Sequence, residues 1–98
     1  MLGVITAIVL IKTTQGRAPE VAESLLQLDG ITEAYSVAGP YDLVAIARVR
    51  QHEDLETLVA AQLQKINGIE NTNTLIAFRA YSRRELEALW DIGNENAS

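Results

Sequence analysis

The chain has 98 residues and a formal net charge of −5, with 48% hydrophobic residues but only 5% aromatic ones. This length suits one domain with an aliphatic core, and the scattered basic residues argue against direct binding of nucleic acid, because phosphate contacts need clustered Lys and Arg. The chain has no cysteine and a single histidine, His52. Disulfides and thiolate chemistry are therefore excluded, and neither a metal site nor a cofactor is expected.

The first expected element is a buried strand near residues 2–12, where the sequence reads "LGVITAIVLIK". This apolar run has the length of a signal-peptide core, but no positively charged region precedes it and no small-residue cleavage site follows it. It is also too short to cross a membrane. We therefore expect a cytoplasmic protein without membrane contact.

Pro19 and Glu20 indicate the start of the first helix, because proline suits the first turn and an acid suits its positive end. The apolar residues of this helix lie on one stripe: Val21, Ala22, Leu25 and Leu28. We expect Gly30 to end the helix, directly after its last turn.

Three further strands are predicted from apolar and alternating patterns, near residues 31–38, 41–50 and 69–81. A short turn at Gly39-Pro40 joins the first two of them. A second helix is predicted from Glu53 and Asp54 to Gly68. Its apolar residues have helical spacing: Leu55, Leu58, Val59, Leu63 and Ile66.

An internal repeat relates the two halves of the chain, since "LDGI" at 28–31 returns as "INGI" at 66–69, a shift of 38 positions (28 to 66). Each half reads strand, helix, strand. Two right-handed βαβ units predict an α+β, ferredoxin-like βαββαβ fold with an antiparallel four-stranded sheet, strand order 4-1-3-2 and both helices on one face.

The two central strands of that sheet are apolar on both faces, as "VITAIVLI" and "LVAIA" show. Helices cover only one face, so the other face would expose a large apolar patch. A second copy of the chain is the simplest cover, which predicts a homodimer of the α/β barrel type. The alternative is a monomer whose own C-terminal tail covers the sheet.

Residues 82–93 are expected to form a C-terminal helix, with Ser82 and Glu85 at capping-box spacing, and 94–98 a disordered tail. An apolar stripe on this helix suits packing on a neighbouring subunit or on the rim of the sheet: Leu86, Leu89 and Trp90. The helix is too short to cover four strands.

Two segments resemble a known family. "GPYDLVAIARV" is similar to G-x-Y-D followed by an apolar strand, and "INGIENTNTLIAF" is similar to L-P-G-V, then T-x-T, then an apolar strand. With both segments in this order within the predicted βαββαβ fold, the chain resembles the effector-binding (RAM) domain of the Lrp/AsnC regulators, over about residues 4–80. The resemblance implies a RAM-like ligand-binding domain over residues 1–81, in a stand-alone form without the family's helix-turn-helix domain.

The resemblance also implies an assembly and a function. Dimers that meet through their sheet faces would assemble into octamers or decamers and bind an amino acid effector between subunits. Such a module would regulate transcription or metabolism indirectly, and a full-length Lrp/AsnC regulator is a further candidate partner.

Carried over by motif, the ligand-binding residues implied are Gly39, Pro40, Tyr41 and Asp42 in the turn and Thr72 and Thr74 in the last strand. Pro40 departs from the family, which often has a small polar or acidic residue there. Glycine lets a backbone approach a ligand closely, a carboxylate can accept from an ammonium group, and the two threonines lie on one face of an ideal strand.

Each of these residues can also have a structural role that involves no ligand. Gly39-Pro40 makes a tight turn in any case, and Asp42 can bond to its own loop backbone. Tyr41 can pack at a subunit interface, and Thr72 and Thr74 can be ordinary edge-strand residues.

Three functions compete. The first is an effector-sensing module. The second is a purely structural oligomerisation domain, and the third is a cofactor-free enzyme on the same dimeric α+β barrel. We do not expect an enzyme or assign catalytic residues, because the single His and single Trp lie at a helix start and in the tail.

Overall fold

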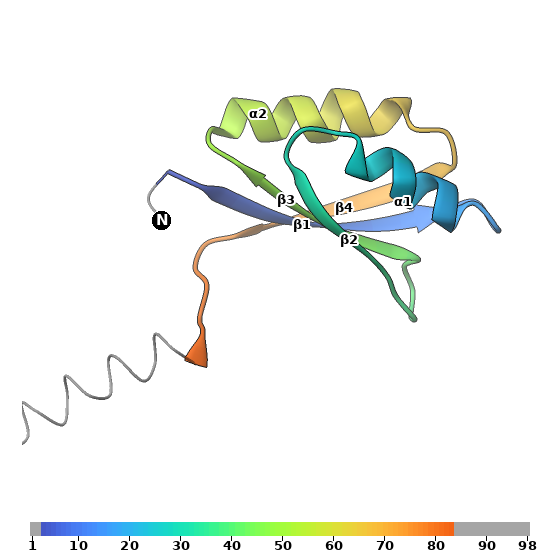
Figure 1. The fold of residues 1–98 in the computed structure, drawn as a ribbon, viewed down its shortest axis with the longest axis horizontal. Coiled ribbons are helices and arrows are strands. Elements are labelled where there is room, and N and C mark those ends of the chain that lie inside the picture. The colour runs from blue at the N-terminus through green and yellow to red at the C-terminus, as the bar shows by residue number, and fades with distance from the viewer. Residues whose placement is uncertain (1–2, 84–98) are drawn as a thin grey trace, which may run out of the picture.

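The computed structural model describes residues 3–83. Its elements follow in the order β1 (Ile5–Thr13), α1 (Ala18–Leu26), β2 (Ile31–Ser36), β3 (Leu43–Val49), α2 (His52–Thr57), the short helices η1 (Leu58–Gln62) and η2 (Leu63–Lys65), and β4 (Ile69–Ala77). The strands form one antiparallel sheet in the order β2-β3-β1-β4, and both helices cover the same face (Figure 1). The predicted ferredoxin-like fold and strand order are confirmed.

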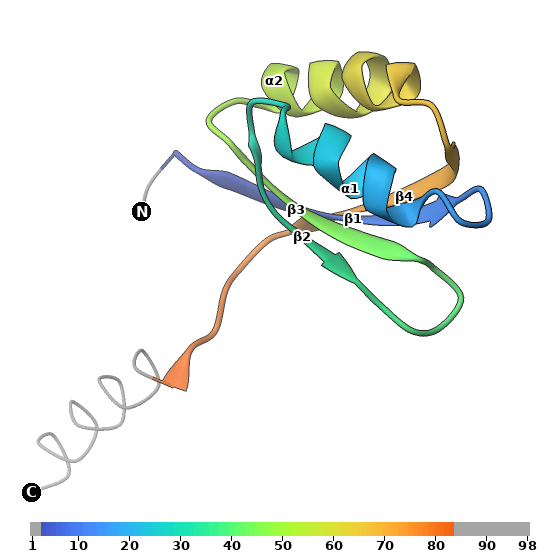
Figure 2. The ribbon, with the colours of Figure 1, turned by 45° about the vertical axis from the view of Figure 1, so that its right-hand side comes forward.

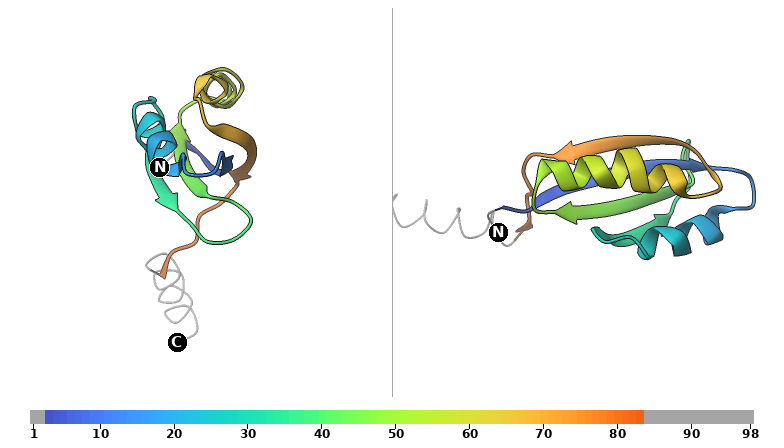
Figure 3. Two further views of the ribbon diagram at one scale, coloured as in Figure 1. Left: turned by 90° about the vertical axis from the view of Figure 1, so that its right-hand side faces the viewer. Right: turned by 90° about the horizontal axis from the view of Figure 1, so that it is seen from above.

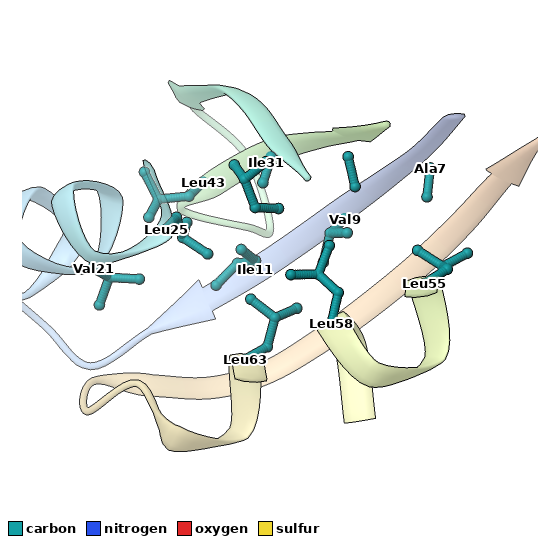
Figure 4. Packing of buried hydrophobic residues seen from close by; sticks show 12 residues of the cluster. Ala7, Val9, Ile11, Val21, Leu25, Ile31, Leu43, Leu55, Leu58 and Leu63 are labelled. Atoms are coloured by element: carbon teal, nitrogen blue, oxygen red, sulfur yellow. The ribbon is translucent and has the colours of Figure 1, made fainter. Parts of the chain in front are cut away.

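The core lies between the helices and alternate residues of the two central strands (Figure 4). Val9 of β1 and Ala45 of β3 face each other in register and are fully buried. The other fully or almost fully buried side chains include Ala7, Ile11, Val21, Leu25, Leu43, Leu58 and Leu63. These aliphatic residues alternate along a strand or lie on one face of a helix, so the apolar pattern in the sequence agrees with the packing in the structure.

The first helix ends earlier than expected. It stops at Leu26, and hydrogen bonds between residues three apart, such as Leu28 N–H to the Leu25 carbonyl, continue the chain toward β2. Gly30 lies in that turn with φ +99°, so it does not end the helix directly as predicted. A Cβ at Gly30 would lie 3.1 Å from Val49 Cγ1, so a glycine at this position lets the backbone approach β3 closely.

The second helix is not uniform as predicted, because α2 passes into a π-helix, η1, and then into a 3-10 turn, η2. Leu58 and Leu63 are five positions apart, and in a regular α-helix they would diverge by about 140°. The wider π turn, in which Leu63 N–H bonds to the Leu58 carbonyl, places both side chains against the sheet. Packing of the two leucines therefore accounts for the change of helix type.

The strands near the hairpin and at the C-terminal end are shorter than predicted. The β2–β3 connection is a loop over 37–42, longer than a turn at Gly39-Pro40 alone. The last strand ends at Ala77 rather than 81, because Ala77 pairs with Thr6 and β1 begins at Ile5, so no strand remains to pair with later residues. Residues 78–83 leave the sheet (Figure 2). The helix and tail predicted over 82–98 lie almost entirely outside the described residues.

The sheet face opposite the helices is called the open face here. Neither α1, α2 nor their short extensions lie over it (Figure 3). Apolar side chains of the central strands alternate with the core residues and point to this face: Ile8, Leu10, Val44 and Ile46. Tyr35 and Leu75 flank them and are 50% and 47% exposed. Within residues 3–83, no helix is long and apolar enough to cross a membrane.

Candidate functional site

The loop over 37–42 closes the β2–β3 hairpin at one end of the sheet. A hydrogen bond from Val37 N–H to the Asp42 carbonyl, 3.1 Å, joins its two ends. Gly39 has φ +131°, and a Cβ there would meet nothing within 4 Å, so the backbone at this point is open to approach. Pro40 is exposed, whereas Tyr41 and Asp42 are half-buried.

Asp42 ties the start of β3 to the end of β1. Its Oδ2 accepts hydrogen bonds from the backbone N–H of Thr13 at 2.8 Å and from Thr13 Oγ1 at 3.3 Å. The Lys12 ammonium lies 3.8 Å from the same oxygen, and Asp42 N–H donates to the Ile11 carbonyl at 2.9 Å. The structural contacts of this carboxylate are therefore with the neighbouring strand and not with its own loop.

The electrostatics of Asp42 follow from these contacts. The hydrogen bond from the Thr13 backbone lowers the pKa of the Asp42 carboxyl, with smaller contributions from the Lys12 charge and the Thr13 hydroxyl. Partial desolvation opposes them. The group is ionised at neutral pH, and its bonds to Thr13 and Lys12 involve only Oδ2.

Thr72 and Thr74 lie on β4, where they pair with Ile11 and Val9. Both partners are core residues of β1, so the two threonines share the helix-covered face, in agreement with the prediction that they point the same way. Both side chains are half-buried. They line the outer edge of the core and not the open face.

Within one chain the loop and the threonines stay apart. Leu43, Ile11 and Thr72 form one row across β3, β1 and β4. Two strand spacings separate the ends of that row, about 10 Å. The structure thus gathers Gly39, Pro40, Tyr41 and Asp42 in the loop, and places Thr72 and Thr74 on the far side of β1.

The structure also forms a polar cluster on β2 and β3, outside the site predicted from the sequence. Arg48 Nη1 donates to Thr32 Oγ1 at 2.8 Å and lies 3.3 Å from Glu33 Oε1, and the Tyr35 hydroxyl donates to Glu33 Oε2. The tyrosine hydrogen bond, followed by Arg48, lowers the pKa of Glu33, and the same bond raises the pKa of Tyr35. The alternation of polar residues in "ITEAYS" could have indicated this row.

No group of three His, Cys, Asp or Glu residues able to hold a metal ion occurs within residues 3–83. The charged residues near the loop and in the cluster are instead paired with each other across strands.

The fold and the positions of the two motifs agree with one family. The family model for the Lrp/AsnC ligand binding domain matches residues 6–86. This chain belongs to the Lrp/AsnC family. The match covers both helices, β2, β3 and β4, and β1 from its second residue, Thr6.

Relatives of this Lrp/AsnC domain are transcriptional regulators. The HTH-type transcriptional regulator FL11 of Pyrococcus furiosus is 34% identical over 77 residues, which is 79% of this chain and 50% of the regulator. FL11 of Pyrococcus abyssi is 33% identical over 75 residues, 76% of this chain and 49% of that regulator. The chain therefore spans about half the length of the curated relatives it matches.

Solved structures share the fold over most of the domain. TTHA0845 from Thermus thermophilus superimposes with a TM-score of 0.75 at 44% identity, covering 81% of this chain and 99% of that one. AsnC of E. coli superimposes with a TM-score of 0.76 at 26% identity, covering 82% of this chain and 54% of AsnC. The fold of this domain thus covers nearly the whole of one solved chain and about half of the other.

Proposed function

We propose that this chain is an effector-sensing module that binds an amino acid between subunits and regulates transcription or metabolism indirectly, in the cytoplasm and without catalysis. The observation that carries the proposal is its membership in the Lrp/AsnC ligand-binding family over residues 6–86. Its curated relatives are transcriptional regulators. A full-length Lrp/AsnC regulator is proposed as a second partner.

The proposed site combines the 39–42 loop of one subunit with Thr72 and Thr74 of another. The two groups are separated across β1 within one chain, and the threonines do not lie on the open face, so this site requires two subunits that meet outside the open-face contact. Open backbone at Gly39 suits the carboxylate of an amino acid, which binds N–H donors. Asp42 is ionised and has Oδ1 outside its contacts with Thr13 and Lys12, so this oxygen can accept from the ammonium group.

The proposed assembly is a homodimer through the open face, which extends to an octamer or decamer. The open face is apolar at its centre, and the charged residues on and beside it are paired, Arg48 with Glu33 and Lys12 with Asp42. A two-fold interface brings a surface against its own copy, so a face without excess charge suits pairing with itself.

Calorimetry and thermal melts against the common amino acids test this function. L-Met is the first probe, because a transcriptional regulator from Neisseria meningitidis with the same fold, 14% identical, was solved in complex with L-Met. A ligand at a hundred times its dissociation constant stabilises the native state by about 2.7 kcal/mol. We expect a selective rise in melting temperature with at least one amino acid.

Single substitutions test the location of the proposed binding site. Asp42→Asn and Thr74→Val should each weaken the binding, whereas Thr57→Val, an exposed threonine on α2, should leave it unchanged. Absence of binding by every amino acid at millimolar concentration, in a protein that still assembles, would favour the purely structural oligomerisation domain instead. Equal loss in all three variants would mean that the effect is on folding and not on the site.

A further inference from the structure

The segment that follows β4 exposes aromatic side chains to an unusual degree. Phe78, the only phenylalanine of the chain, is 99% exposed, and Tyr81 is 72% exposed. The Arg79 guanidinium lies 5.3 Å from the centre of the Tyr81 ring, a cation–π contact within the segment. Residues 78–83 are called the C-terminal arm here. An exposed aromatic pair in a segment that leaves the sheet marks a contact surface.

The direction of the arm indicates which surface it meets. It leaves the end of β4 on the side of the sheet opposite α1 and α2, and the three figures agree on this direction (Figures 1, 2 and 3). That side is the open face, where Leu75 of β4 is also half exposed. Whatever covers the open face must therefore lie beside the arm.

The arm has the length to reach a second sheet. Packed sheets lie about 10 Å apart, and six extended residues span up to about 20 Å. Phe78, the first residue of the arm, would lie at the level of the gap between the sheets, and Tyr81 at the level of the second sheet.

Charge favours another copy of this chain as the surface that the arm meets. The arm contains two arginines, Arg79 and Arg83, and no acidic residue, whereas residues 3–77 contain five basic and nine acidic residues, a net charge of −4 (5 − 9). A basic arm is attracted to an acidic partner, and this attraction is reciprocal in a symmetric dimer.

We propose that the C-terminal arm is exchanged between two copies of this chain, with Phe78 closing the edge of the sheet-to-sheet contact against the second copy. The inference rests on the proposed open-face dimer and adds a part to it. By two-fold symmetry each dimer contains two such contacts, one at each copy's β4 end.

The single phenylalanine makes a direct test feasible. Biosynthetic labelling of the full chain with 4-fluorophenylalanine gives one ¹⁹F resonance, which reports on Phe78 alone. Its relaxation by a soluble gadolinium chelate measures solvent access, while sedimentation velocity measures assembly in the same sample. We expect the resonance to be protected in the assembled protein and to become accessible in Ile8→Asp, which places a charge on the open face and disrupts the dimer.

Affinity gives a second readout. Phe78→Ala should weaken the dimer by at least about 30-fold, the range of an interface hot spot. Leu26→Ala is the matched control, because Leu26 is an exposed aliphatic residue on the helix side. It should leave the dimer dissociation constant within about twofold of the wild type.

The possible outcomes distinguish failure of the arm exchange from failure of the open-face dimer. An accessible resonance in a protein that sediments as a dimer or a larger assembly would overturn the arm exchange and leave the open-face dimer intact. A monomer with an accessible resonance would overturn both. A monomer with a protected resonance would mean that Phe78 packs on its own chain, which also overturns the exchange.

Discussion

Val21 on α1 occupies the space that a side chain at Gly68 would need, since a Cβ at Gly68 would lie 2.9 Å from Val21 Cγ2. The same Cβ would lie 3.3 Å from Arg17 Cβ. The start of β4 therefore passes directly against the first helix. Thr14 N–H donates to the Gly68 carbonyl at 2.8 Å and fixes this approach.

Gly68→Ala should destabilise the protein through two effects. Its φ of +102° costs a residue with Cβ about 1–2 kcal/mol, and overpacking against Val21 adds about 1–3 kcal/mol. Gly16→Ala is the control, because Gly16 has φ +82° but a Cβ there would meet nothing within 4 Å. Chemical denaturation measures both. Equal destabilisation of the two variants would contradict the steric part of the argument.

The bond between Asp42 and Thr13 predicts a pH dependence. Because the folded-state pKa of Asp42 is lowered from its ordinary value of 3.8, its contribution to stability is present above that value. The contribution is lost as the pH falls through the lowered folded pKa. Asp42→Asn should therefore be less stable than the wild type near neutral pH, and the difference should shrink in acid.

Urea unfolding from about pH 7 down to about pH 2 measures this difference. Thr13→Val is the matched control, since it removes the 3.3 Å hydroxyl contact but keeps the backbone N–H bond that is the main cause of the shift. It should retain most of the pH dependence. Parallel stability curves for the wild type and Asp42→Asn over the whole range would refute the linkage.

The π turn between Leu58 and Leu63 predicts an unusual tolerance to deletion. Removing the exposed Ala61 places the two leucines four positions apart, which is the spacing of one face in a regular α-helix. We expect the deletion variant to fold with both leucines buried, within about 1–2 kcal/mol of the wild type.

Leu63→Ala provides the comparison. It removes a fully buried leucine of the same turn, which should cost about 2–5 kcal/mol. Thermal melts followed by circular dichroism measure both variants. If the Ala61 deletion destabilises as much as Leu63→Ala, the π turn is not a simple one-residue insertion.

The polar cluster on the open face predicts a change in one titration. Tyr35→Phe should raise the pKa of Glu33 toward its ordinary value, because the tyrosine hydroxyl is the largest cause of the lowered value. NMR titration of the Glu33 side-chain carboxyl detects the shift. Tyr41→Phe, which alters a tyrosine in the 37–42 loop, should leave this titration unchanged. A Glu33 curve that is the same in Tyr35→Phe and wild type would show that Arg48 alone sets it.

Much of the fold could be predicted because it depends on periodic patterns. Apolar residues on both faces of β1 and β3 identified the central strands, and the repeat at 38 positions (28 to 66) gave two βαβ units. The same period-2 rule placed Thr72 and Thr74 on one face. The candidate site was harder to predict, because its residues were chosen by motif, and a motif carries no information about distances between strands.

By itself, the sequence determined which segments are strands and helices and which strands are central, because backbone periodicity and apolar patterning are local properties. Only the tertiary structure decided that β4 ends at Ala77, that α2 widens into a π turn, and that Asp42 bonds to Thr13, 29 positions away. Each of these depends on the register and length of a neighbouring element. The strand end and the Asp42 bond involve residues distant in the chain, and the π turn depends on how its leucines pack against the sheet, so no local pattern encodes them.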